Sequence, residues 1–119
     1  MGKPEKKVED HLIKRVEEDL NGFVRKCVFP GRRGAPDRIA FIPQAGAVFI
    51  EVKTTLGELS KLQVRERKRM IGVGCRVVVL SGKREVDAFI ESVKTQLKPT
   101  NTQLVEIRED LINEHSETS

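Results

Sequence analysis

The chain has 119 residues and a formal net charge of +4, with 22 Lys and Arg against 18 Asp and Glu. This length suits one domain with a single core and excludes two. No apolar run approaches membrane-spanning length, and no apolar stretch follows the Lys-rich first residues, so we expect neither a transmembrane helix nor a signal peptide. Cys27 and Cys75 lie in apolar runs, which predicts buried, reduced thiols and a cytoplasmic protein.

Apolar periodicity and turn residues predict seven elements along the chain. In chain order, we expect a helix over residues 4–20, strands near 23–29, 37–42 and 47–53, a helix over 60–71, a strand over 75–80 and a helix over 84–97. Pro43-Gln44-Ala45-Gly46 has the composition of a hairpin turn between the second and third strands. The predicted order is therefore a helix, three strands of which the last two form a hairpin, a helix, a strand and a helix.

This order predicts an α/β fold in which helices flank a mixed central sheet. Strands linked by a hairpin, followed by one crossover helix that leads to a further strand, imply a mixed sheet with helices packed on it. We expect residues 1–97 to form the domain, because Pro99 ends the last helix. In the tail over residues 98–119, Leu104, Ile107 and Leu111 recur at helical spacing, which predicts a short amphipathic helix.

The strand near residues 47–53 ends in Glu51-Val52-Lys53. Because strand side chains alternate between the two faces of a sheet, Glu51 and Lys53 should share one face. Asp37 follows the turn residues Gly34-Ala35-Pro36 at the start of the preceding strand. Two carboxylates and one ammonium group at a sheet edge pack poorly, but they suit hydrolysis assisted by a divalent metal.

We interpret this group as a site for phosphodiester hydrolysis. Asp37 and Glu51 would bind Mg²⁺ or Mn²⁺, the backbone carbonyl of Val52 could be a third ligand, and Lys53 would contact the scissile phosphate or the attacking water. The alternative is an exposed salt bridge between Glu51 and Lys53, with Asp37 capping a turn. The run from Val48 to Val52 argues against it, because that run is too apolar for an exposed edge strand.

Glu9 projects into the apolar stripe that runs from Val8 to Leu20 on the first helix. A carboxylate in such a position requires a cation or a metal as its partner. One interpretation is an interior salt bridge to Lys26 or Lys53. The other, which we favour, is an acid in the outer shell of the metal.

Ser60-Lys61-Leu62-Gln63 fits a capping box at the start of the second helix, which explains both Ser60 and Gln63 structurally. Gln63 also lies on the same side of the helix as Val64, Met70 and Ile71, the side that we expect to face the sheet. An amide there could orient a water or a phosphate. From the residues alone the two interpretations are equal.

Basic residues gather around Asp37 and along the second helix. They are Arg32, Arg33 and Arg38 in the first group, and Lys61, Arg65, Lys68 and Arg69 in the second. Such stripes are usually solvated faces, but arginines beside a metal site also suit contacts to phosphates on either side of a cut. No aromatic residues alternate with them, which disfavours base stacking on a single-strand platform.

Four segments together resemble the virus-type replication-repair nuclease (VRR-NUC) family of the PD-(D/E)xK nuclease superfamily. They are Gly34-Ala35-Pro36-Asp37, Phe49-Ile50-Glu51-Val52-Lys53, Leu59-Ser60-x-x-Gln63 and Gly74-Cys75-Arg76-Val77-Val78-Val79. The likeness covers residues 8–90, and the four segments in combination are far more specific than any one of them. The segment after Pro99 is not part of the family pattern.

The resemblance implies a restriction-endonuclease-like αβββαβ core and Mg²⁺- or Mn²⁺-dependent cleavage of DNA. Asp37, Glu51 and Lys53 match the family's two catalytic acids and its lysine, and Gln63 matches its helix glutamine. Glu9 matches an acid on the first helix of the family. Lys26 falls where members often carry a lysine, which adds it to the expected DNA contacts.

Small members of the family, many of them encoded by phages, tend to be homodimers that act on branched DNA such as four-way (Holliday) junctions. The resemblance therefore implies a structure-specific endonuclease of DNA repair or recombination in a bacterial or phage-infected cytoplasm. One alternative is a less selective nuclease that nicks flaps or single strands. The other is a DNA-binding accessory domain without activity, which the intact Asp37, Glu51 and Lys53 argue against.

Overall fold

The computed structural model describes residues 4–54 and 57–97. Its elements in chain order are α1 (Pro4–Leu20), β1 (Phe23–Lys26), β2 (Arg38–Ile42), β3 (Gly46–Lys53), α2 (Lys61–Gly72), β4 (Val77–Ser81) and α3 (Gly82–Leu97). This αβββαβα order is the predicted one. The amphipathic helix expected within residues 98–119 lies outside the described residues.

The four strands form one mixed sheet in the order β1-β2-β3-β4. β1 and β2 pair antiparallel, as do β2 and β3, whereas β3 and β4 pair parallel. The β2–β3 hairpin turns where predicted, with Ala45 N donating to Ile42 O at 3.0 Å and with Gln44 and Gly46 both at positive φ. The parallel pair requires a crossover, which α2 supplies, so the predicted α/β class is confirmed.

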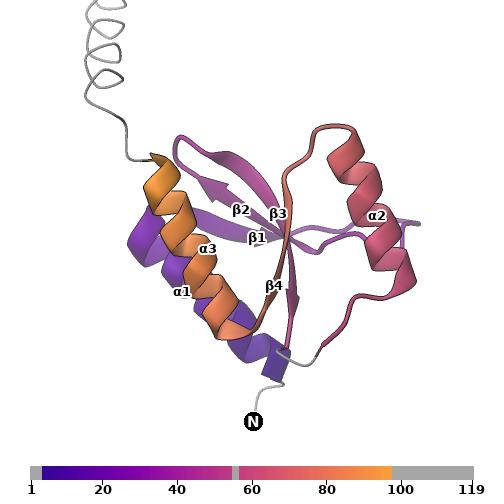
Figure 1. Ribbon diagram of the computed structural model, residues 1–119, viewed down its shortest axis with the longest axis horizontal. Helices are drawn as coiled ribbons and strands as arrows, with labels where there is room; N and C mark the ends of the chain where they lie inside the picture. The colour runs from indigo at the N-terminus through magenta and orange to yellow at the C-terminus, as the bar shows by residue number, and fades with distance from the viewer. Residues whose placement is uncertain (1–3, 55–56, 98–119) are drawn as a thin grey trace, which may run out of the picture.

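The two faces of the sheet are covered unequally (Figure 1). α1 and α3 pack side by side on one face, and α2 stands alone on the other. On the first face, alternate residues of β3 are fully buried beneath the apolar stripe of α1 and the inner side of α3. The buried residues include Val48, Ile50 and Val52 of β3, Val8, Leu12, Val16 and Leu20 of α1, and Val86, Phe89, Ile90 and Val93 of α3. This layer is the core of the protein.

α2 packs less closely than expected. Met70 is its one buried residue, whereas Val64 and Ile71 are 38% and 45% exposed. Residues 63, 66, 67 and 70 recur at helical spacing on the inner side, and this rotation puts positions 64 and 71 on a partly exposed flank of the helix. The prediction that Val64 and Ile71 face the sheet is therefore wrong, while Met70 and Gln63 do face it.

Two strands are shorter than predicted. β1 ends at Lys26 rather than at residue 29, and β4 begins at Val77 rather than at residue 75. Val28 is largely exposed, so the apolar run there leaves the sheet. Cys27 and Cys75 consequently lie just outside the strands as half-buried free thiols instead of buried ones. Burial nevertheless raises the pKa of the Cys27 thiol, with a smaller contribution from Asp37.

None of the described helices combines the length and the apolar character that crossing a membrane requires.

Candidate active site

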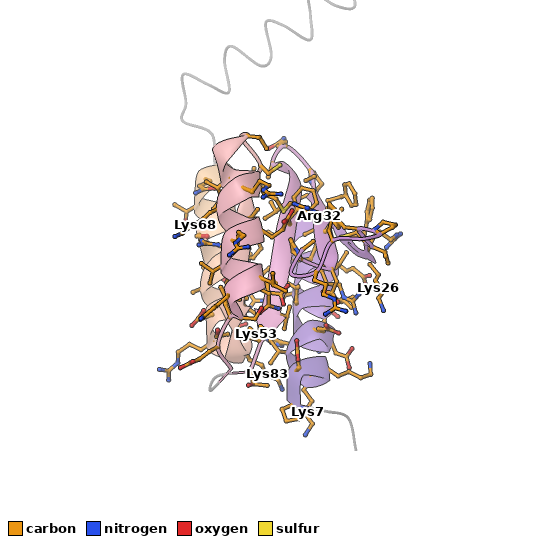
Figure 2. All side chains as sticks on the ribbon, turned by 90° about the vertical axis from the view of Figure 1, so that its right-hand side faces the viewer. Lys7, Lys26, Arg32, Lys53, Lys68 and Lys83 are labelled. Carbon is orange, nitrogen blue, oxygen red and sulfur yellow. The ribbon has the colours of Figure 1, made fainter. Side chains whose placement is uncertain are left out.

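Glu51 and Lys53 lie on the face of β3 opposite to the buried residues of the same strand, and Glu51 reaches Gln63 of α2. Lys53 Nζ lies 3.8 Å from Glu51 Oε1, and the side chains of Lys53 and Glu51 are only 19% and 13% exposed. The predicted shared face is therefore observed, and the pair is not the exposed surface salt bridge of the alternative interpretation. In Figure 2, Lys53 lies between the ribbons of α2 and α1.

Gln63 joins α2 to this pair. Its side-chain nitrogen donates to Glu51 Oε1 at 2.7 Å, while its side-chain oxygen accepts from the Ser60 backbone N–H at 2.8 Å. Ser60 Oγ accepts in return from the Gln63 backbone N–H at 3.1 Å, which completes the predicted capping box. One amide thus caps the helix with its oxygen and holds the Glu51 carboxylate with its nitrogen. The capping interpretation of Gln63 is confirmed, whereas its role in orienting a water or a phosphate stays a prediction.

Asp37 reaches the same end of the sheet from the neighbouring strand. It directly precedes β2, where Arg38 pairs with Ile50, so Asp37 lies beside Glu51 across the antiparallel ladder. The loop before it passes against the start of α2 at Gly34, which has φ +86°. A Cβ there would lie 2.5 Å from the carbonyl carbon of Leu62, so only glycine permits this approach.

The Glu51 carboxyl has an unusual environment for an acid. Burial raises its pKa to about 7; Lys53 opposes the shift, and the charges of Asp37, Glu5 and Glu9 add to it. A buried acid surrounded by other acids gains much from any cation that binds beside it. The local charge distribution therefore favours a metal ion at this point.

Oxygen donors of this kind fit a hard divalent cation. Among residues 4–54 and 57–97, no three His, Cys, Asp or Glu side chains are placed to enclose a metal on their own. Mg²⁺ does not require such a cage, because it is commonly bound by one or two carboxylates and keeps several of its waters. Asp37, Glu51 and the backbone carbonyl of Val52 could supply the protein ligands.

Glu9 forms an ion pair with Arg38, which was not among its predicted partners. Arg38 donates from a terminal guanidinium nitrogen to Glu9 Oε2 at 3.0 Å, and both side chains are largely buried. The interior salt bridge is therefore to Arg38 and not to Lys26 or Lys53. Because Arg38 directly follows Asp37, this pair fixes the start of β2 against α1.

The basic residues predicted to contact DNA lie in several separate parts of the molecule. Arg32, Arg33, Arg65 and Arg69 line a hollow of about 340 Å³ between the loop before Asp37 and α2. Within it, Arg32 pairs with Glu66 at 3.2 Å. Lys61 and Lys68 lie on the outward side of α2, and Lys26 is exposed at the end of β1, away from α2 (Figure 2). Arg38 is the exception, since its guanidinium is engaged by Glu9.

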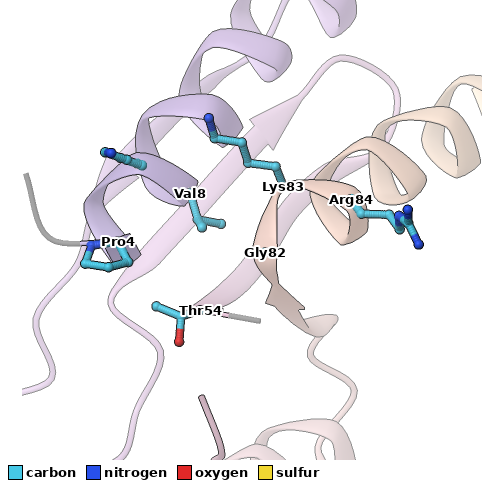
Figure 3. A pocket seen from close by; sticks show the side chains of 7 residues that line it. Pro4, Val8, Thr54, Gly82, Lys83 and Arg84 are labelled. Carbon is cyan, nitrogen blue, oxygen red and sulfur yellow. The ribbon is translucent and has the colours of Figure 1, made fainter. Parts of the chain in front are cut away.

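A second cationic region, beside the end of β3, was missed from the sequence (Figure 3). Thr54, which directly follows β3, lines a hollow of about 630 Å³ between the starts of α1 and α3. Lys83 extends toward α1 there, whereas Arg84 points away from Val8. The parallel pairing of Lys53 with Ser81 brings these segments together. That register could not be read from the local sequence.

The chain is similar in sequence and in structure to known proteins. No protein-family model matches the sequence. A candidate nuclease, p44 of Acyrthosiphon pisum secondary endosymbiont phage 1, is 37% identical over 76 residues, which are 64% of this chain and 81% of p44. A solved structure named VRR_NUC domain has a TM-score of 0.70 and 34% identity, covering 76% of this chain and 97% of its own. Another, named VRR_NUC domain protein, shares the fold with a TM-score of 0.59 at 18% identity, covering 77% of this chain and 88% of its own.

Proposed function

Since this chain belongs to the VRR-NUC family, we propose that it is a nuclease that hydrolyses phosphodiester bonds in DNA with Mg²⁺ or Mn²⁺. The observation that carries the proposal is the contact of Gln63 and Lys53 with the same Glu51 oxygen, next to Asp37. These groups come from the residue before β2, from β3 and from α2. A merely structural role would not require three segments to converge on a carboxyl whose pKa is about 7.

Each residue has a role that its position supports. Asp37, Glu51 and the Val52 carbonyl would hold the metal, which when bound supplies an activated water and neutralises charge on the phosphate. Lys53 would contact the scissile phosphate or the attacking water. Gln63 orients the Glu51 carboxylate, and Glu9 acts through Arg38 on the strand that carries Asp37.

We propose that the substrate is branched DNA, such as a four-way junction, and that the active form is a homodimer. Cationic side chains lie on both sides of the site, at the hollow lined by Arg32 and Arg65 and at the one lined by Lys83. That distribution suits DNA backbones entering from more than one direction. A junction with two-fold symmetry in turn suits two sites related by a dyad. The setting would be the cytoplasm of a bacterial or phage-infected cell.

A less selective nuclease of flaps or single strands is the second candidate. Phe23 stacks on Phe41 at 5.1 Å between ring centroids, and Arg25 lies over the Phe23 ring. Phe23 is 43% exposed, but Phe41 and Arg25 already cover part of its ring, and one such ring does not make a platform for stacking successive bases. The geometry therefore favours recognition of the DNA backbone and shape.

A cleavage assay tests the proposal. The protein is incubated with labelled four-way junction, flap, duplex and single-stranded DNA, in Mg²⁺, Mn²⁺ or EDTA, beside Asp37→Ala and Lys53→Ala. We expect metal-dependent cutting that both substitutions abolish, with paired symmetric cuts in the junction. Absence of metal-dependent cutting on every substrate would overturn the enzyme assignment. Cutting that survives both substitutions would overturn the site.

A further inference from the structure

One exposed flank of α2 carries an apolar strip edged by cations. Val64 and Ile71 are seven residues apart, and therefore lie on the same side of the helix two turns from each other. Lys61 precedes Val64, and Lys68 precedes Ile71, by three residues, so each lysine neighbours one apolar side chain. We call these four residues the outer strip. At its first turn lies a hollow of about 410 Å³ that Lys61, Val64 and Lys68 line together with Leu59 and Arg65.

The charge of α2 limits what can cover the outer strip. The helix carries five cationic residues and a single acid; these are Lys61, Arg65, Arg67, Lys68 and Arg69, and Glu66. A second copy of α2 packed on the strip would set this basic face against itself, which costs free energy. A favourable occupant has apolar side chains of its own and a negative charge.

The end of this chain has both properties. Leu104, Ile107 and Leu111 recur at helical spacing. After Pro99 the sequence contains five carboxylates and one arginine; these are Glu106, Glu109, Asp110, Glu114 and Glu117, and Arg108. No comparable acidic apolar segment occurs between Phe23 and Leu80, where the basic residues gather. The negative charge and the apolar spacing of this segment are thus complementary to the outer strip.

The position of Leu97 brings the tail within reach. The last turn of α3 lies beside the segment that follows α2, because Arg76 donates to Gln96 Oε1 at 2.9 Å. Ile71 is at the end of α2, and its carbonyl accepts from Gly74 N in that same connection. Residues 98–103 can span about 20 Å when extended. The 12 residues of α2 make a helix about 18 Å long, so residues 104–111 can lie along it.

We propose that residues 104–111 pack on the outer strip of α2 in the same chain, with Leu104, Ile107 and Leu111 against Val64 and Ile71. The tail carboxylates then lie near Lys61 and Lys68. Under the proposed function Lys61, Arg65 and Lys68 contact the DNA backbone, so the tail and DNA compete for α2. This competition rests on the proposed function, whereas the packing of the tail does not. Coverage in about nine molecules of ten would weaken DNA binding about tenfold.

The absence of Trp and Tyr from the chain makes the packing measurable by fluorescence. Leu111→Trp introduces a sole Trp on the apolar side of the segment, and Asn113→Trp places it on the opposite side. In the full chain we expect emission at shorter wavelength from the first variant only. Adding Val64→Asp and Ile71→Asp should shift it to longer wavelength, whereas Leu62→Asp, on the other flank of α2, should not.

Each outcome bears on the proposal. Equal long-wavelength emission from both Trp variants would overturn the packing, as would emission that Val64→Asp and Ile71→Asp leave unchanged while circular dichroism shows a folded protein. A short-wavelength emission that develops only as protein concentration rises would overturn packing within one chain, in favour of a second copy. Emission that is independent of concentration supports it.

Competition with DNA is tested separately from cleavage. A duplex oligonucleotide is titrated in EDTA into Lys53→Ala that also carries Leu111→Trp, so that no cutting occurs. We expect the emission to move to longer wavelength as DNA binds, and the triple change Glu106→Gln, Glu109→Gln and Asp110→Gln to tighten DNA binding about tenfold. DNA that binds without changing the emission would overturn the competition. The proposed nuclease activity fails instead only if the unmodified protein cuts no substrate with metal.

Discussion

The two faces of the sheet contrast in what their side chains do. On the face beneath α1 and α3, β3 presents Ile50 and Val52, which are buried among aliphatic residues. On the face toward α2, the same strand presents Glu51 and Lys53, and α2 adds Gln63. One strand therefore serves both the core and the site, because successive side chains point to opposite faces. Stability and chemistry can then be altered separately.

The largest expected effect of any change is on the site face. Lys53→Ala or Asp37→Ala should lower the single-turnover cleavage rate about a thousandfold, because each removes a group placed to stabilise charge in the transition state. The free energy of unfolding should change little, since neither side chain belongs to the apolar core. Equal cleavage by the variants and the unmodified protein, or loss of folding in urea, would break the contrast between the faces.

A substitution on the core face should instead lower stability and leave the cleavage rate of the folded protein unchanged. Leu12→Ala removes a fully buried side chain of α1 and should lower the free energy of unfolding by about 2–5 kcal/mol. Urea unfolding followed by circular dichroism measures this loss. A folded fraction of the variant should still cleave DNA at the normal rate. Leu62→Ala, at an exposed position of α2 outside the outer strip, is the matched control and should have a far smaller effect on unfolding.

The Glu51 carboxyl, on the site face, should make the stability of the whole protein depend on pH. Its pKa is about 7 in the folded protein and near 4.5 in the unfolded chain, so the folded state retains a proton that the unfolded state releases between these values. In metal-free protein the free energy of unfolding should therefore fall as pH rises from about 4.5 to about 7. The loss is on the order of 3 kcal/mol and is complete above pH 7.

Glu51→Gln should remove this pH dependence while abolishing cleavage. Thermal unfolding in EDTA across that pH range measures the first effect. Adding Mg²⁺ at pH 8 should raise the melting temperature of the unmodified protein and leave that of Glu51→Gln nearly unchanged, because a metal stabilises the ionised carboxylate. An identical response of the two proteins to Mg²⁺ would separate Glu51 from the metal site.

The smallest of these effects concerns Gln63, which belongs to both the helix cap and the site. Gln63→Glu keeps an acceptor for the Ser60 backbone N–H but loses the donor to Glu51, so α2 should stay capped while cleavage falls about tenfold. Gln63→Leu loses both contacts and should also destabilise the protein by about 1 kcal/mol. Comparing cleavage and urea unfolding for the two variants tells the two contributions apart.

Local patterns predicted much of this arrangement. The alternation in β3 placed Glu51 and Lys53 on one face, and the Ser60-to-Gln63 spacing predicted the capping box that is observed. Both patterns depend on neighbours a few residues apart, whose geometry the backbone dictates. The catalytic roles of these residues stay predictions. Strand ends were predicted less well, because Cys27 and Cys75 continue apolar runs that leave the sheet.

The sequence by itself determined the order of the elements, the mixed sheet and the acid–lysine pair, because these follow from short-range periodicity and turn residues. Only the tertiary structure decided that Glu9 pairs with Arg38 and that Gln63 reaches Glu51. It also decided that Val64 and Ile71 lie on an exposed flank of α2 and do not face the sheet. Those outcomes depend on how α1 and α2 are rotated against the sheet. That rotation is set by packing between residues distant in the chain, so local spacing cannot specify it.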